Sequence, residues 1–150
     1  MLNRDFKEFA ECLHAEGVEY LVVGGYALAA HGHPRYTGDI DFWLRPDLTN
    51  VERALRALDR FGFDSLGPKV ADFSAESVVQ LGQPPRRIDL LTTIDGVAFN
   101  DACARREAVR VDGLVLLIIG LDDFKTNKRA TGRLKDLADL EALDKGVATD

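Results

Sequence analysis

The sequence predicts a single α/β domain in which helices pack on a mixed β-sheet. Short apolar runs of strand length alternate with longer segments of helical periodicity along the whole chain. An Asp112-Gly113 pair between two apolar runs predicts a β-hairpin within the same sheet. The length of 150 residues fits one domain, residues 1–150, with a core of its own.

The first half of the chain has a clear signal for each element. Phe6, Phe9 and Leu13 recur at three- and four-residue spacing, which predicts a helix with one buried face. Pro34 is expected to end the second helix, because the residue before a proline avoids the helical conformation. In order, we expect a helix at 3–15, a strand at 20–23, a helix at 26–32, a strand at 39–44 and a helix at about 49–60.

The second half continues the alternation of strands and helices. Gly82 to Pro85 separates two apolar runs, and Gly132 divides the last helical segment. We expect strands at 77–81 and 87–91, a helix at 100–107, hairpin strands at 109–111 and 114–119, and helices at 121–131 and 134–143.

Asp39-Ile40-Asp41 is the most informative stretch of the sequence. In a strand, side chains alternate between faces, so Asp39 and Asp41 project together, with Trp43 on the same face. Two carboxylates about 7 Å apart repel each other and lose hydration unless a cation neutralises them. Oxygen ligands without a nearby Cys favour Mg²⁺ or Mn²⁺ over zinc. The alternative is an exposed edge strand that carries charges against aggregation.

Asp89 is a third candidate ligand, inside the apolar run from Arg87 to Leu91. If this run is a strand beside residues 39–44, Ile88 and Leu90 face the helices and Asp89 joins the carboxylate face. The alternative is a surface acid that pairs with Arg87.

Gly24-Gly25 falls where a buried strand turns into a helix. Glycine lets a ligand approach the backbone, and the free N–H groups of the helix N-terminus attract phosphate. Phosphates at one end and metal-binding acids at the other indicate a nucleoside triphosphate chelated to Mg²⁺. The alternative for these glycines is simple packing of helix on strand.

The order Gly24-Gly25, Asp39-Ile40-Asp41 and Asp89 resembles the hG[GS]…Dh[DE]h…D signature of the polymerase-β-like nucleotidyltransferase superfamily. The resemblance covers roughly residues 18 to 92. Within this superfamily, the sequence is most similar in its motifs to small bacterial nucleotidyltransferase-like proteins, some of which belong to toxin–antitoxin systems. The resemblance implies a nucleotidyltransferase-type mixed sheet, a triphosphate held by the glycines, and two metal ions held by the three catalytic carboxylates.

Basic residues near the end of the chain are further candidates. Residues 125–135 contain five basic side chains and no acid, and the stretch from Lys128 resembles the endings of small nucleotidyltransferase-like proteins. In such relatives a late lysine or arginine contacts the triphosphate or the acceptor, which implies this role for Lys125 or Lys128. A solvated helix face explains the same pattern equally well. Thr37, in the loop before Asp39, is a candidate contact to the nucleotide or a turn residue.

Composition narrows the class of protein. The net charge of −6 argues against a general nucleic-acid coat but not against local contact with RNA. No apolar run reaches the length of a membrane span, and the acidic, amphipathic start is unlike a signal peptide. Cys12 and Cys103 are isolated, as expected for reduced thiols. We therefore expect a cytoplasmic protein without membrane contact.

The leading hypothesis is transfer of a nucleoside monophosphate from a triphosphate to an acceptor hydroxyl. The acceptor is open between an RNA end, a protein hydroxyl and a small molecule such as an antibiotic, and the base is open too. One alternative is a non-catalytic nucleotide- or metal-binding member of a toxin–antitoxin or regulatory complex, with an antitoxin-like partner protein. A weaker one is a two-metal phosphohydrolase, which has no need of the glycine turn.

Overall fold

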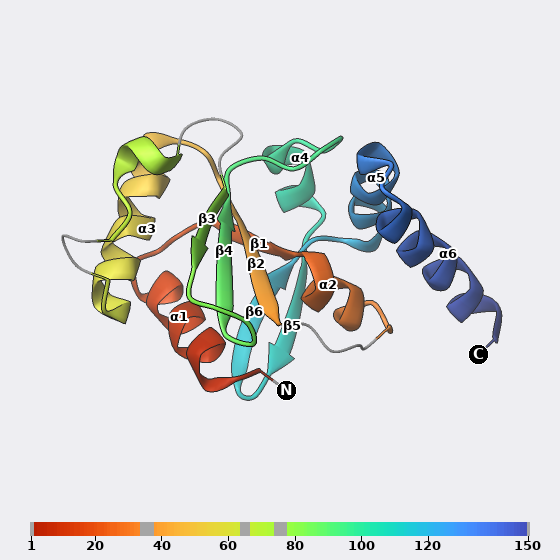
Figure 1. Cartoon of the computed structure of the whole chain (residues 1–150), viewed down its shortest axis with the longest axis horizontal. Helices are drawn as coiled ribbons and strands as arrows, with labels where there is room; N and C mark the ends of the chain where they lie inside the picture. The colour runs from red at the N-terminus through yellow and green to blue at the C-terminus, as the bar shows by residue number, and fades with distance from the viewer. Residues whose placement is uncertain (1, 34–37, 64–66, 74–77, 150) are drawn as a thin grey trace.

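A six-stranded sheet in the order β3-β4-β2-β1-β6-β5 forms the centre of the computed structural model (Figure 1). The structure describes residues 2–33, 38–63, 67–73 and 78–149, with side chains up to residue 144. The strands are β1 (Tyr20–Val23), β2 (Asp39–Leu44), β3 (Val78–Leu81), β4 (Arg87–Leu91), β5 (Glu107–Val111) and β6 (Leu114–Ile118). The helices are α1 (Arg4–Ala15), α2 (Gly24–Ala30), α3 (Leu48–Phe61), α4 (Phe99–Ala104), α5 (Leu121–Thr131) and α6 (Leu134–Thr149), with a 3₁₀ turn η1 (Val70–Phe73).

The sheet is mixed, and β2 lies in its interior. β2 runs antiparallel to β1 and parallel to β4, and β1 pairs in parallel with β6. β3 and β5 are antiparallel to β4 and β6. This single α/β domain confirms the predicted fold class. The alternative that the two acids protect an exposed edge strand is wrong, because β2 has a neighbour on each side.

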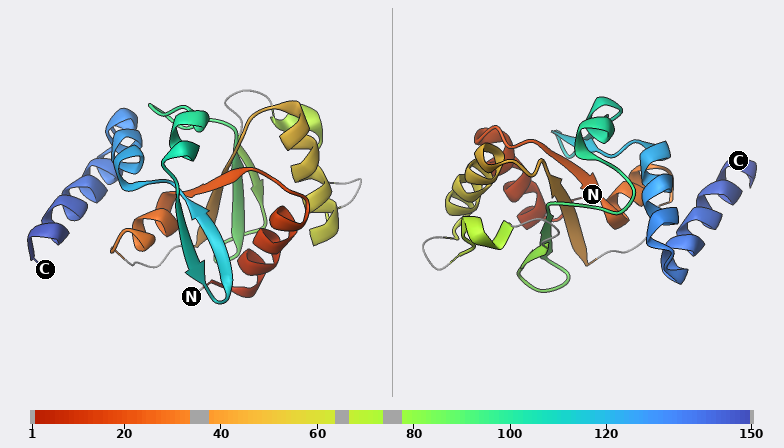
Figure 2. Two further views of the ribbon diagram at one scale, coloured as in Figure 1. Left: turned by 180° about the vertical axis from the view of Figure 1, so that it is seen from behind. Right: turned by 90° about the horizontal axis from the view of Figure 1, so that it is seen from above.

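The two faces of the sheet carry different helices. Figures 1 and 2 show α1 and α3 on one side and α5 and α6 on the other. On the first side, the Phe9 ring of α1 lies 5.5 Å from that of Phe42 in β2 and 5.3 Å from that of Phe61 in α3. On the second side, Trp43 packs edge-to-face on Phe99 of α4, with ring centroids 5.1 Å apart. The alternation predicted for β2 is therefore confirmed: Trp43 shares the face of Asp39 and Asp41.

Side-chain caps fix the starts of the two helices on the first face. Asn3 accepts a hydrogen bond from the backbone N–H of Phe6, and Asp47 accepts one from that of Asn50. Such caps satisfy N–H groups that have no partner within the helix. They place α1 and α3 within a residue of the predicted starts.

Several boundaries differ from the prediction. α2 begins at Gly24 rather than Tyr26, so the glycine pair forms its first turn. The expected helix at 100–107 ends at Ala104, because Glu107 already pairs with Ile118 in the hairpin. The 3₁₀ turn η1 was not predicted, and α6 continues beyond residue 143 to Thr149.

Within the described ranges, no helix combines the length and the apolar character that crossing a membrane requires.

Candidate active site

Asp39, Asp41 and Asp89 come together because β2 and β4 are parallel neighbours. In the register of the two strands Asp41 lies opposite Asp89, and Asp39 lies opposite Arg87. Each carboxylate offers an oxygen, and these oxygens all lie within 4.8 Å of one another. Asp39 and Asp41 are half-buried, while Asp89 is only 5% exposed. The three acids predicted as ligands therefore form one cluster on one face of the sheet.

The Arg87 guanidinium contacts Asp89, which the sequence offered as an alternative, and also Asp39, which the sequence did not predict. Arg87 Nε and Nη2 donate to the two oxygens of Asp89 at 3.0 and 3.2 Å, and Nη2 also donates to Asp39 Oδ2 at 3.0 Å. The sequence-based alternative of an Asp89–Arg87 pair is correct as a contact, although Asp89 is buried rather than at the surface. The guanidinium thus links two of the three acids.

Burial makes the remaining acid, Asp41, hard to ionise. Burial, together with the negative charge of Asp39 and a hydrogen bond with Asp89, raises the pKa of Asp41 to about 8. Burial also raises the pKa of Asp89, while hydrogen bonds from Asp41 and Arg87 oppose that rise. The raised pKa of Asp41 favours its protonated form at neutral pH, in which its hydroxyl donates a hydrogen bond to a carboxylate oxygen of Asp89. A bound cation would favour release of this proton.

Gly24 provides the space that Asp41 occupies. Its φ of +70° is in the left-handed region, and a Cβ added there would overlap Oδ2 of Asp41. Val23, the residue before it, lies opposite Asp41 in the β1–β2 register. Gly24 thus positions a candidate metal ligand, a role distinct from both the phosphate contact and the simple packing considered for it. Gly25 follows in the first turn of α2.

A cleft of about 340 Å³ opens beside the acids. Its walls come from the β1–α2 junction, β2, the segment after β4, and α5 with the turn that follows it. The lining residues are Val23, Gly24, Asp39, Asp41, Leu91, Thr93, Ile94, Asp95, Asn127, Lys128, Thr131 and Arg133. Residues 93–95, Asn127 and Thr131 were not predicted, because the packing of α5 against the segment after β4 has no signal in the sequence. Arg133 belongs to the basic run of residues 125–135.

The basic candidates occupy different positions. Lys128 lines the cleft but is only 7% exposed, and its Nζ lies 2.8 Å from Asp136 Oδ1 and 3.4 Å from Asp139 Oδ2. The side chain of Arg133, by contrast, is 73% exposed and pairs with Asp136 at 2.7 Å. Lys125 is not among the lining residues, and it pairs with Asp144 at 3.1 Å.

Asp136 binds both Lys128 and Arg133. Burial would raise the pKa of Asp136, but hydrogen bonds from Lys128, Thr131 and Arg133 outweigh burial and hold that pKa well below its usual range. Thr37, the other predicted nucleotide contact, lies outside the described residues.

The donor set fits a hard divalent cation. Carboxylate oxygens are the ligands that Mg²⁺ and Mn²⁺ prefer, and the cluster contains neither sulfur nor imidazole. Asp39, Asp41 and Asp89 could therefore hold Mg²⁺ or Mn²⁺.

The backbone arrangement around this cluster has a counterpart among solved structures. The crystal structure of a presumed nucleotidyltransferase from Thermotoga maritima matches 98% of this chain and 92% of its own, with a TM-score of 0.62 and 20% sequence identity. The chain has the nucleotidyltransferase fold. In this fold Asp39 and Asp41 of β2 line the cleft, and Asp89 of β4 has an oxygen within 4.8 Å of theirs. The fold that the resemblance implied is therefore confirmed. No protein-family model matches the sequence, and a search of curated proteins gives no match.

Proposed function

We propose that the protein is a divalent-metal-dependent nucleotidyltransferase that moves a nucleoside monophosphate from a triphosphate to an acceptor hydroxyl. One observation carries the proposal. Three carboxylates from two adjacent strands converge within 4.8 Å beside a cleft, in a fold shared with a presumed nucleotidyltransferase. Carboxylates brought this close together repel one another, and a bound cation would relieve that repulsion.

Asp39, Asp41 and Asp89 are the residues that would hold Mg²⁺ or Mn²⁺. When bound, the cation supplies neutralising charge for the triphosphate and a lower pKa for the acceptor hydroxyl. The acids would orient the cation from a rigid sheet, since β2 pairs with β4 from Asp39 to Trp43. Because phosphoryl transfer depends on positioning and on neutralising charge, a nucleophilic Ser or Cys is not required.

Phosphate binding falls to the glycine turn and to α5. We assign the β- and γ-phosphates to the backbone of Gly24 and Gly25 at the start of α2, because glycine permits close approach of a ligand. Arg133 offers an exposed guanidinium at the cleft, whereas the charge of Lys128 is already balanced by two acids. We therefore assign Arg133 the direct phosphate contact. Lys128 supports it from within, and Lys125 and Thr37 remain secondary candidates.

The walls of the cleft would receive the nucleoside. Its volume of about 340 Å³ is at the small end of ligand pockets, which suits one nucleotide with part of it exposed. Thr93 and Asp95 are exposed there beside the half-buried Ile94, so an apolar contact and two polar groups are available to a base and ribose. The acceptor would approach from the open side, where an RNA end, a protein or a small molecule fits equally.

A non-catalytic binding module is the second candidate, and Arg87 is the observation that favours it. A guanidinium and a protonated Asp41 neutralise the acids without any metal, as in a protein that only binds a nucleotide or an antitoxin-like partner. Either function fits the cytoplasm, where the free thiols of Cys12 and Cys103 would stay reduced.

Labelled triphosphates separate these functions. The protein is incubated with each α-³²P nucleoside triphosphate, Mg²⁺ and either total RNA, cell protein or small hydroxyl compounds. Transfer yields pyrophosphate and a labelled acceptor, and Asp39→Asn should abolish both. Hydrolysis without a labelled acceptor, or the same labelling by Asp39→Asn, contradicts the proposal, and neither product indicates a binding module.

A further inference from the structure

We propose that Arg87 is a built-in counter-ion that competes with a divalent cation for Asp39 and Asp89. Occupation of the site then requires the guanidinium to leave these carboxylates. The inference rests on the proposed metal-binding role of the three acids and adds a control on when they bind. It assigns Arg87 a positioning role that acts through its acidic partners.

The competition follows from which oxygens Arg87 uses. Its guanidinium takes both oxygens of Asp89, at 3.0 and 3.2 Å, and one oxygen of Asp39, at 3.0 Å. A cation needs lone pairs of these same carboxylates. Moreover, the positive charge of Arg87 would stand at contact distance from the positive ion, where the repulsion is strong. The cation and the guanidinium therefore cannot share Asp89 without cost.

The position of Arg87 allows it to leave. Its side chain is 31% exposed, while that of Asp89 is 7% exposed, so the arginine forms the outer layer of the pair. A long side chain can swing toward solvent without a change in β4, whose backbone is paired on both sides. The sheet and the acids stay in place while the counter-ion moves.

This arrangement predicts cooperation between cation and triphosphate. A lone cation gains the carboxylates but must displace Arg87, so it binds weakly. A cation that arrives with a triphosphate brings additional oxygen ligands and negative charge, which offset that cost. Arg87 would thus weaken the binding of free metal to the acids more than the binding of the metal–nucleotide complex.

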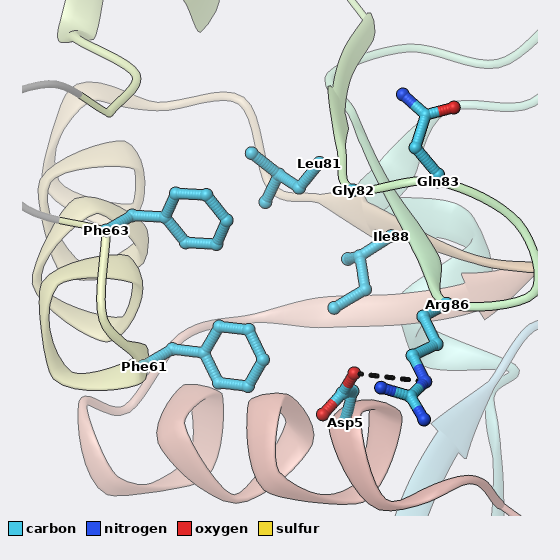
Figure 3. Close-up of a pocket in the computed structure, with 8 residues that line it drawn as sticks. All are labelled: Asp5, Phe61, Phe63, Leu81, Gly82, Gln83, Arg86 and Ile88. Carbon is cyan, nitrogen blue, oxygen red and sulfur yellow. Dashed lines mark ion pairs between the residues drawn. The ribbon is translucent and has the colours of Figure 1, made fainter.

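Arg86 provides a matched control. It is the adjacent arginine, but its side chain is 72% exposed and pairs with Asp5 of α1 at 3.8 Å, on the other side of the sheet. Figure 3 shows Arg86 beside Asp5 at the rim of a pocket of about 350 Å³ lined by Phe61, Phe63, Leu81 and Ile88. Arg86→Met removes the same charge as Arg87→Met and leaves the acids untouched.

The test is a Mn²⁺ titration without nucleotide, followed by electron paramagnetic resonance. Arg87→Met should bind Mn²⁺ at least about tenfold more tightly than the unchanged protein, equivalent to about 1.4 kcal/mol. Arg86→Met should stay within about twofold, and Asp89→Asn added to Arg87→Met should remove the gain. Adding triphosphate should improve Mn²⁺ binding more in the unchanged protein than in Arg87→Met.

Equal or weaker binding by a folded Arg87→Met would overturn the inference and leave Arg87 as a residue that merely holds Asp89. If Arg87→Met does not fold, Arg87→Lys carries the test, because an ammonium cannot span both carboxylates. It must then bind Mn²⁺ more tightly than the unchanged protein, and equal affinity overturns the inference. Gain of Mn²⁺ affinity without any nucleotidyl transfer would refute the proposed function alone. Absence of Mn²⁺ binding in every protein, with triphosphate present, would refute the metal site itself.

Discussion

At the scale of single residues, Gly24 and Asp41 are fitted to each other. The glycine has a left-handed φ, and its missing side chain leaves the volume into which the carboxylate of Asp41 projects. One substitution at position 24 should therefore act on a metal ligand in a different strand.

Gly24→Ala is expected to displace the Asp41 carboxylate and weaken Mn²⁺ binding by at least about tenfold, which corresponds to about 1.4 kcal/mol. Gly17→Ala is the control, because Gly17 has a φ of +69°, close to the +70° of Gly24, and nothing lies within 4 Å of its added Cβ. Both variants should lose about 1–2 kcal/mol of stability from backbone strain. Equal Mn²⁺ affinity in the two variants, measured by titration, would show that the Asp41 contact is unimportant.

Asp41 gives the metal-free protein an unusual pH dependence. Its carboxyl has an ordinary pKa of 3.8 and a pKa of about 8 when folded. Below about pH 4 both states hold the proton, and between these pKa values only the folded state does. The contribution of Asp41 to the free energy of unfolding is thus fully present at low pH and falls as pH rises toward 8.

Urea unfolding at pH 5 and pH 8, in chelator, measures this effect. Relative to Asp41→Asn, the free energy of unfolding of the unchanged protein should fall by on the order of 2 kcal/mol between the two pH values. Partial solvation of the Asp41 carboxyl makes this loss smaller than the full pKa shift would give. Mg²⁺ should reduce the loss. An identical pH profile for the two proteins would contradict the burial and charge that surround Asp41.

Residue-level prediction succeeded where a local rule governs the geometry. Strand alternation placed Asp39, Asp41 and Trp43 on one face, and the same rule joined Asp89 to them once β2 and β4 were taken as neighbours. The contact between Arg87 and Asp39 could not be predicted, because it depends on a register that sets these two residues opposite each other.

At the scale of elements, α5 and α6 are joined by a buried network of charges. Lys128 of α5 is surrounded by Asp136 and Asp139 of α6, and all three side chains are less than a tenth exposed. The sequence could not distinguish this from a solvated basic face, because the acids that complete the network lie in the next helix.

Lys128→Met should lower the free energy of unfolding by about 3 kcal/mol, because it removes the buried cation that Asp136 and Asp139 share. Lys125→Met is the matched control in the same helix. Its partner Asp144 has a side chain that is 63% exposed, so the loss should be under about 1 kcal/mol. Guanidinium unfolding of both variants measures the difference. If both variants lose a similarly small free energy of unfolding, the charge of Lys128 is not needed by the two acids and would be available to bind phosphate.

Element boundaries were predicted less well than element types. The segment before the hairpin has helical character in the sequence, but from Glu107 onward it is a strand that pairs with β6. Pairing between strands is a tertiary effect, and it overrides local propensity. The first strands and helices were predicted well because glycine, proline and capping residues mark their ends.

At the scale of the whole molecule, the sheet brings together segments that are far apart in the sequence. β1 ends at Val23, just before Gly24, β2 carries Asp39 and Asp41, β4 carries Asp89, and α5 lines the cleft beside the two acids of β2. The charges on both sides of the cleft are neutralised by residues of the same chain. Arg87 pairs with the acids, and Asp136 pairs with the basic residues. Under the proposed function, a cation and a triphosphate would replace these internal ion pairs.

The central claim is that Asp39, Asp41 and Asp89 hold the cation that accompanies a triphosphate in this cleft. Crystals grown with Mn²⁺ and a non-hydrolysable nucleoside triphosphate analogue test it most directly, through the anomalous signal of manganese. We predict a manganese peak coordinated by oxygens of all three carboxylates, the triphosphate between the start of α2 and Arg133, and the Arg87 guanidinium moved away from Asp89. A triphosphate bound elsewhere, or manganese absent from these carboxylates while Arg87 keeps its place, would contradict it.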